Sequence, residues 1–137
     1  MIKHRGQYEV IDHPLHPDLV LHLIGAGNKR AVLLGQSVRV TGTRLGSFKK
    51  SLTCAGCERV GERFYLERHR KRNGEAKYGE GWHLNLYAIN SNGTETLMTR
   101  DHIIPRSKGG KDKLSNSQTM CTHCNHRKAD KMPEGKE

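Results

Sequence analysis

Two closely spaced cysteine pairs constrain this chain more than any other feature. Cys54 and Cys57 form one C-x-x-C clip, and Cys121 and Cys124 form a second. Four thiolates in two such clips have the spacing of a tetrahedral zinc site, although four cysteines can also form two disulfides. A reducing cytosol favours zinc over disulfides. We therefore expect a structural Zn²⁺ ion on all four cysteines, with His123, inside the second clip, as the alternative ligand.

Hydropathy predicts a small cytoplasmic protein. No apolar segment typical of a secretory signal follows the basic N-terminus, and no stretch approaches the ~20 apolar residues that span a bilayer. Only 34% of the 137 residues are hydrophobic, so a chain of about one domain would bury a small core. Small cores usually need a disulfide or a structural metal ion for stability, and the cysteine clips supply the residues for one.

The charge balance predicts an acidic partner. The chain has 24 Lys and Arg residues against 14 Asp and Glu residues, which gives a formal net charge of +10. Scattered charges often do no more than solvate a surface, but a surplus of this size is typical of proteins that bind a phosphate backbone. We expect a partner with a phosphate backbone, with binding that weakens steeply as salt rises.

Hydrophobic periodicity and turn residues predict a mixed order of helices and strands. Residues 83–89 alternate, Asn92-Gly93 is a strong turn dipeptide and residues 94–100 return, which together predict a β-hairpin. Residues 118–130 have helix-forming content, and Pro133 would stop a helix there. The other predicted elements are a short helix at 17–24, strands at 37–41 and 63–67, and a loop at 69–81.

A second set of polar residues accompanies the clips. Asp101 and His102 lie at the predicted end of the hairpin, Asn116 follows in a loop, and Asn125 directly follows Cys124. Phosphodiester hydrolysis needs a base, a divalent cation and a fixed geometry. An imidazole is suited to accept a proton near neutral pH, and carboxylate and amide oxygens are ligands that Mg²⁺ accepts together with water. Asn116 is expected to hydrogen-bond backbone and to hold the segment that carries His102.

The neighbouring positions of Asp101 and His102 pose a geometric question. Adjacent residues of a strand point to opposite faces, so both serve one site only if the strand ends or twists there. Pro105 favours an end. The second clip would bring Asn125 toward this pair, so we expect zinc to be structural and the reaction to depend on a second ion.

The spacing of these residues resembles that of the HNH endonuclease family. The resemblance covers roughly residues 44–131 and rests on the run from Asp101 to Gly110 (DHIIPRSKGG), on Asn116, and on C-x-x-C-N-x-x-K at 121–128. It is similar in particular to small phage-type HNH proteins with two zinc clips, so a host-cell cytoplasm is expected if a phage encodes the chain. The resemblance implies an α+β fold with a small zinc-stapled, treble-clef-like ββα-metal core.

The resemblance also implies a role for each site residue. His102 would be the general base that activates water, Asp101 would bind the catalytic cation, and Asn116 would stabilise the loop. The third motif position directly follows the last cysteine and is often histidine. Here it is Asn125, which implies an oxygen ligand and favours Mg²⁺ or Mn²⁺ over softer ions.

We therefore expect a metal-dependent DNA endonuclease in three segments. Residues 1–43 would form a basic N-terminal extension that contributes to DNA engagement, residues 44–132 the nuclease domain, and residues 133–137 a tail. The basic residues expected to contact DNA near the site are Arg106, Lys108, Arg127 and Lys128.

Two other functions are open to such a sequence. A zinc-stapled DNA-binding module without catalysis explains the charge and the cysteines, but it leaves the joint spacing of Asp101, His102, Asn116 and Asn125 unexplained. An RNA-directed nuclease is less favoured, because the sequence lacks an evident aromatic stacking platform. The sequence sets neither the oligomeric state nor the choice between nicking and double-strand cleavage.

Overall fold

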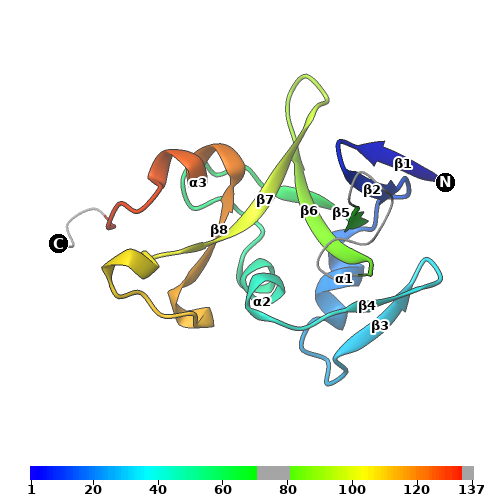
Figure 1. Cartoon of the computed structure of the whole chain (residues 1–137), viewed down its shortest axis with the longest axis horizontal. Helices are drawn as coiled ribbons and strands as arrows, with labels where there is room; N and C mark the ends of the chain where they lie inside the picture. Colours follow the sequence, from blue (N-terminus) through cyan, green and yellow to red (C-terminus); the bar gives the residue numbers. More distant parts are fainter. Residues whose placement is uncertain (71–80, 134–137) are drawn as a thin grey trace. The chain divides into compact units, whose positions relative to one another are not determined.

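The computed structural model describes residues 1–70 and 81–133 (Figure 1). The chain divides into two compact units: unit 1 comprises Met1–Thr41 and Arg63–Leu86, and unit 2 comprises Gly42–Glu62 and Tyr87–Glu137. The strands β5 (Gly61–His69) and β6 (His83–Ile89) contribute residues to both units. Residues 63–86, which the sequence analysis assigned to the nuclease domain, thus cluster with the N-terminal residues.

Unit 1 is built from short antiparallel strands and one helix. The helix α1 (Pro17–Leu23) confirms the short helix expected at 17–24; Pro17 opens it, and the ring of His16 accepts a hydrogen bond from the Asp18 backbone N–H. The strands are β1 (Ile2–Arg5), β2 (Tyr8–Ile11), β3 (Arg30–Leu33) and β4 (Gln36–Arg39), besides the larger parts of β5 and β6. β2 pairs with both β1 and β5, whereas β3 and β4 form a separate hairpin.

Unit 2 is organised around the strand β7 (Glu95–His102), which pairs with β6 on one side and with β8 on the other. The β6–β7 hairpin is confirmed as predicted, with Gly93 at a φ of 85° in its turn. Glycine suits that position because it carries no Cβ. The other elements of the unit are α2 (Thr43–Lys50), the 3-10 turns η2 (Arg106–Lys108) and η3 (Leu114–Asn116), β8 (Ser117–Cys121) and α3 (Thr122–Lys128).

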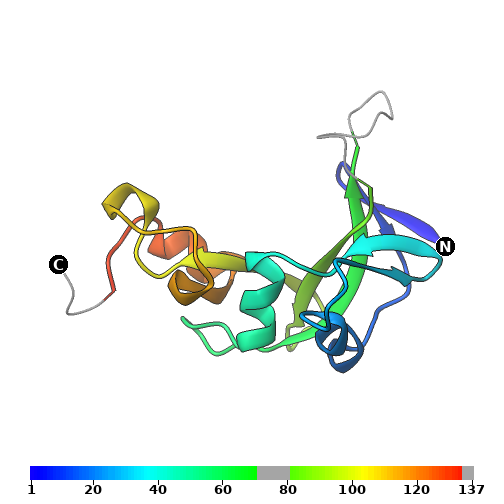
Figure 2. The ribbon, with the colours of Figure 1, turned by 90° about the horizontal axis from the view of Figure 1, so that it is seen from below.

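The two faces of the β7–β8 pair meet different helices. The register pairs Asp101 with Gln118, and it pairs His102 with Ser117, so Asp101 and His102 point to opposite faces. On the Asp101 face, Lys128 of α3 contacts the strand. On the other face, Thr119 donates to the backbone oxygens of Ser47 and Ser51 beside α2. Figures 1 and 2 both show α3 beside β7 and β8.

The helix expected at 118–130 is wrong in its first four residues. Ser117–Cys121 forms β8, and the helix α3 begins only at Thr122. Cys121 caps the helix, since its side chain accepts from the backbone N–H of Cys124, while its own N–H donates to the sulfur of Cys54. Contacts within the cysteine cluster therefore fix the start of the helix, and local helix propensity does not.

Two further expectations concern the rest of the chain. The loop expected at 69–81 falls largely on residues 71–80, which lie outside the described residues. The segment before the first clip, which the sequence left without an element, forms α2. Within the part of the chain that the structure describes, there is no helix that is long and apolar enough to cross a membrane.

Candidate functional site

The four cysteines come together in unit 2. Their sulfur atoms all lie within 4.8 Å of one another, and the Sγ atoms of Cys57 and Cys121 are 3.7 Å apart. Zinc–sulfur bonds of about 2.3 Å in a tetrahedron place neighbouring sulfurs about 3.8 Å apart. The cluster therefore has the ligand type and the spacing for a tetrahedral metal ion such as zinc. His123 is exposed and lies outside this cluster.

Hydrogen bonds orient the cysteine sulfurs. The sulfur of Cys54 accepts from the backbone N–H groups of Gly56 and Cys121, at 3.3 and 3.2 Å. A Cβ on Gly56 would lie 2.9 Å from the Cβ and Sγ atoms of Cys124, so the first clip needs glycine there to approach the second. Contacts between the two clips thus hold them together even without a bound ion.

Two arginines contact the sulfurs from outside the cluster. Arg59 donates to the Sγ atoms of Cys57 and Cys121, at 3.2 and 3.5 Å, and Arg127 of α3 donates to Cys124 at 3.2 Å. The hydrogen bonds to Cys57 and Cys121 raise the pKa of Arg59, and that to Cys124 raises the pKa of Arg127. Both guanidinium groups are therefore charged hydrogen-bond donors to the cysteine sulfurs.

The thiols differ in acidity. Burial raises the pKa of Cys124 to about 12. Burial also acts to raise the pKa of Cys57, but hydrogen bonds from the Arg59 backbone and from the neighbouring cysteines outweigh it and lower the pKa to about 6. At neutral pH the metal-free cluster therefore retains protons, and binding of an ion must release them.

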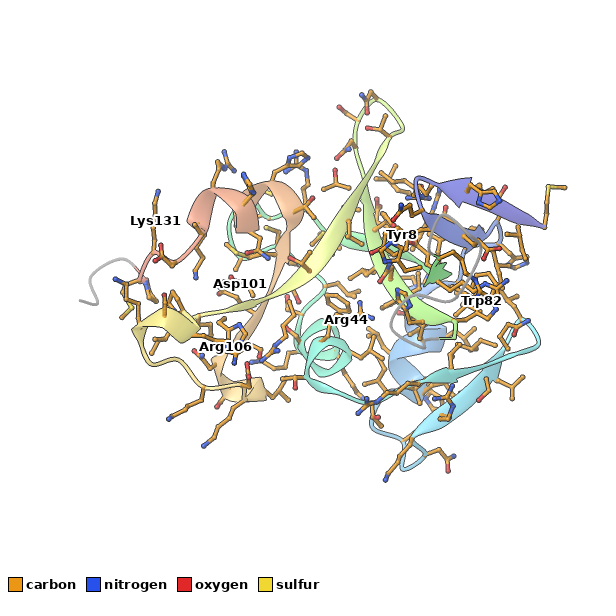
Figure 3. All side chains as sticks on the ribbon, in the orientation of Figure 1. Tyr8, Arg44, Trp82, Asp101, Arg106 and Lys131 are labelled. Carbon is orange, nitrogen blue, oxygen red and sulfur yellow. The ribbon has the colours of Figure 1, made fainter. Side chains whose placement is uncertain are left out.

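Asp101 and Asn125 lie on the same side of the β7–β8 pair, facing α3. Asp101 is buried, and its Oδ2 atom accepts from Gln118 at 3.0 Å and forms an ion pair with Lys128 at 3.2 Å (Figure 3). Asn125 donates through its side-chain nitrogen to Thr99 at 2.8 Å. Among the described residues, Asp101 Oδ1 and the side-chain oxygen of Asn125 accept no hydrogen bond. Carboxylate and amide oxygens are ligand types that Mg²⁺ and Mn²⁺ prefer, so Asp101 and Asn125 are the residues on this side that could hold such an ion.

His102 leaves the strand on the opposite face. Its ring nitrogen Nε2 hydrogen-bonds Asp112, and a guanidinium nitrogen of Arg100 lies 3.4 Å from the same atom. Arg100 in turn donates to Ser117 at 2.9 Å. The structure therefore brings Asp101 and Asn125 to one face, while the side chain of the neighbouring His102 lies on the other.

Asn116 closes the loop that follows β7. Its side-chain oxygen accepts from the Ile104 N–H at 2.8 Å, and its side-chain nitrogen donates to the carbonyls of Ile104 and Lys111, both at 3.0 Å. These are the backbone contacts expected of a loop-holding asparagine. They fix the two ends of the segment 104–111 against each other, directly after His102.

The loop also requires a glycine at its narrowest point. A Cβ on Gly110 would overlap the Ile104 carbonyl and would lie 2.9 Å from the carbonyl oxygen of Pro105. We expect Gly110→Ala to lower the free energy of unfolding by about 2 kcal/mol, because the backbone must move to accept the methyl group. Thermal melting measures the change. Gly81→Ala is the matched control, since no atom lies within 4 Å of a Cβ there, and equal melting temperatures for the two variants would contradict the prediction.

The four basic residues expected at DNA differ in their contacts. Lys128 has a side chain only 14% exposed, because it bonds Asp101 and the His102 carbonyl, and Arg127 bonds Cys124. Arg106 and Lys108 are exposed, although Arg106 lies 3.8 Å from Asp112 (Figure 3). Arg106 and Lys108 therefore have the surroundings of phosphate ligands, whereas Arg127 and Lys128 take part in the internal contacts of the site.

Sequence reasoning missed several partners of the site residues. Gln118 and Thr99 hold Asp101 and Asn125, and Arg100 and Asp112 contact His102. The strand register would have indicated Gln118, once β8 was known to pair with β7. For Asp112 the only signal was an acidic residue in the loop that Asn116 closes.

Fold and site together define a small α+β protein with a cluster of four cysteines that could hold a metal ion, and with polar residues at the end of a β-strand. Residues 90–135 match the family model of HNH endonucleases, so this segment is similar to that family. The matched segment contains Asp101, His102, Asn116 and Asn125. Neither the search of curated proteins nor that of solved structures found a match.

Proposed function

We propose that this protein is a metal-dependent endonuclease that hydrolyses phosphodiester bonds of DNA. One observation carries the proposal: inside the segment that matches the HNH family, a buried carboxylate and an amide oxygen share the β7–α3 face, and the imidazole that ends β7 lies on the opposite face of the same strand end. A divalent cation held by Asp101 and Asn125 would offset the charge on the phosphate and on the leaving oxygen. Mg²⁺ or Mn²⁺ suits that oxygen donor set.

The protein's own groups would act at the end of β7. His102 takes a proton from a water molecule, the resulting hydroxide attacks phosphorus, and one P–O bond breaks so that the leaving oxygen departs as an alcohol after protonation by solvent. A phosphate lying across the strand end would meet the Asp101 face on one side and His102 on the other. Asn116 keeps the loop after His102 closed. The four cysteines would hold a Zn²⁺ ion, which would fix α3, with Asn125, against β7.

The choice of DNA rests on charge. The net charge of +10 suits a polyanion, and Arg106 and Lys108 are exposed close to the site. Phosphate contacts of this kind position a duplex without reading its sequence. We therefore propose cleavage with little base specificity from unit 2 itself. We also propose that residues 1–43 contribute to DNA engagement.

The proposal predicts that His102→Ala abolishes cleavage. Loss of a general base lowers the rate by about 100-fold to 10,000-fold, whereas His126→Ala, an exposed histidine on α3, should cleave as the unmodified protein does. The measurement is conversion of supercoiled plasmid to nicked or linear product with Mg²⁺, with Mn²⁺ and with EDTA. Equal plasmid cleavage by the unmodified protein and His102→Ala, or none by either on any DNA substrate, would overturn the proposal.

A second candidate is a zinc-stapled DNA-binding module without catalysis. The ion pair between Lys128 and Asp101 favours it, because an ammonium group already neutralises the carboxylate that a metal ion would need. DNA binding that is unchanged when Mg²⁺ and Mn²⁺ are omitted, together with intact plasmid in every metal condition, would support this function. Cleavage that is lost with His102→Ala excludes it.

A further inference from the structure

Asp112 is an acidic residue of the site that has no assigned role. Its Oδ1 atom hydrogen-bonds the Nε2 atom of His102, and it lies 3.6 Å from a guanidinium nitrogen of Arg100. Its Oδ2 atom lies 3.8 Å from Arg106. Asp112 is thus the acid that contacts the imidazole on which the proposed hydrolysis depends, and the following inference rests on that proposed function.

The chemistry of the contact determines which atom carries the proton. The hydrogen bond from His102 is the largest of the effects that hold the pKa of Asp112 below its ordinary value, so the carboxylate is ionised at neutral pH. An ionised carboxylate accepts hydrogen bonds and cannot donate. The Nε2 atom of His102 must therefore carry the hydrogen in this contact. In a neutral imidazole with hydrogen on Nε2, the lone pair that can accept a proton lies on Nδ1.

We propose that Asp112 is a positioning residue for His102, which holds the imidazole by its Nε2–H so that Nδ1 faces the water that is to be activated. Water gives a proton to Nδ1, and the ring becomes an imidazolium with both nitrogens protonated. The hydroxide adds to phosphorus as the P–O bond to the leaving oxygen breaks. The imidazolium then returns the Nδ1 proton to solvent, and Nε2–H remains on Asp112 throughout.

The loop does not need Asp112 to keep its shape. Asn116 joins Ile104 to Lys111, and the N–H of Gly110 donates to the Pro105 carbonyl at 2.9 Å. The side chain of Asp112 is 54% exposed, so it buries little surface against the loop. Its contacts are directed at His102 and the two arginines, which is the arrangement of a group that orients a base.

A double-mutant cycle with His102 tests the inference. We expect Asp112→Ala to lower the single-turnover rate of plasmid cleavage about tenfold to a hundredfold, with the DNA dissociation constant unchanged. Asp112→Asn should recover part of the rate, because an amide oxygen still accepts the hydrogen bond. Asp130→Ala is the matched control for charge, since it removes an exposed acid of the same unit and should cleave normally.

The second arm of the cycle uses a His102→Gly background, with imidazole added to supply a freely diffusing base. There Asp112→Ala should have no further effect on the rate, because the ring that it positions is absent. An equal loss in both backgrounds, or an unchanged rate for Asp112→Ala alone, would overturn the inference. If His102→Ala cleaved DNA as well as the unmodified protein does, the proposed function itself would be wrong. An unchanged rate for Asp112→Ala alone would overturn only the role of Asp112, so the two failures are distinguishable. Thermal melting of each variant shows that the loss is not one of folding.

Discussion

Cys121→Ser is expected to leave unit 2 unfolded at 25 °C. A structural zinc ion contributes about 10–16 kcal/mol of apparent binding free energy, and this exceeds the total stability of most small domains. Cys121 has a further role here, because its sulfur caps α3 and its backbone N–H donates to Cys54. Serine keeps the backbone N–H and can also cap a helix, so the loss expected in Cys121→Ser is that of a metal ligand. Circular dichroism and the zinc content per chain measure the outcome.

His123→Ala is the matched control for the cysteine variant. The residue lies inside the same clip but is exposed and outside the cluster, so its removal should change neither the melting temperature nor the zinc content. Addition of a strong chelator to the unmodified protein should reproduce the Cys121→Ser result. A Cys121→Ser protein that melts like the unmodified protein and carries a full complement of zinc would show that the cluster is not a structural metal site.

Lys128→Met should lower the free energy of unfolding by about 3 kcal/mol. The side chains of Lys128 and Asp101 are only 14% and 8% exposed, so the substitution leaves a buried carboxylate without its cation. The hydrogen bond to the His102 carbonyl is lost as well. Lys131→Met is the matched control, because Lys131 is an exposed lysine shortly after α3, and its change should be close to neutral (Figure 3). Urea unfolding of the zinc-bound protein, in buffer without Mg²⁺ or Mn²⁺, measures both variants.

The same variant reports on the candidate cation site. If Asp101 and Asn125 bind a divalent cation, Mg²⁺ or Mn²⁺ should stabilise Lys128→Met more than it stabilises the unmodified protein, because the ion supplies the positive charge that the ammonium supplied. Lys128→Met combined with Asp101→Asn should lose this metal effect. Equal metal effects in the unmodified protein and in Lys128→Met would argue against Asp101 as a ligand.

The sequence predicts those parts of the fold that are determined by residues close together in the chain. The β6–β7 hairpin follows from alternation and from the Asn92-Gly93 turn, and the cluster of cysteines follows from the clips. The sequence does not predict β8, because the contacts that form this strand come from residues far away in the chain. Its residues have helix-forming content, but they pair with β7, and Cys121 is held by the sulfur of Cys54, 67 residues away in sequence.

The residues of the candidate site stay a prediction, and the structure shows how they are arranged. The family spacing indicated Asp101, His102, Asn116 and Asn125, and the expected backbone contacts of Asn116 are present. The side-chain directions of Asp101 and His102 depend on whether β7 continues through both. It does, and the pairing of His102 with Ser117 sends the imidazole toward Asp112. Such pairing comes from a second strand, so the residues around His102 alone do not determine it.

The two arginines on the cysteine cluster change how that cluster affects a nucleic acid. Four thiolates around one Zn²⁺ carry a formal charge of −2, and a double negative charge would repel an approaching phosphate backbone. Arg59 and Arg127 each contribute one positive charge in direct contact with the sulfurs. The sum is zero. With zinc bound, the cluster and its two arginines would carry no net charge. The cluster would then not oppose the attraction between a nucleic acid and the surplus positive charge elsewhere on the chain.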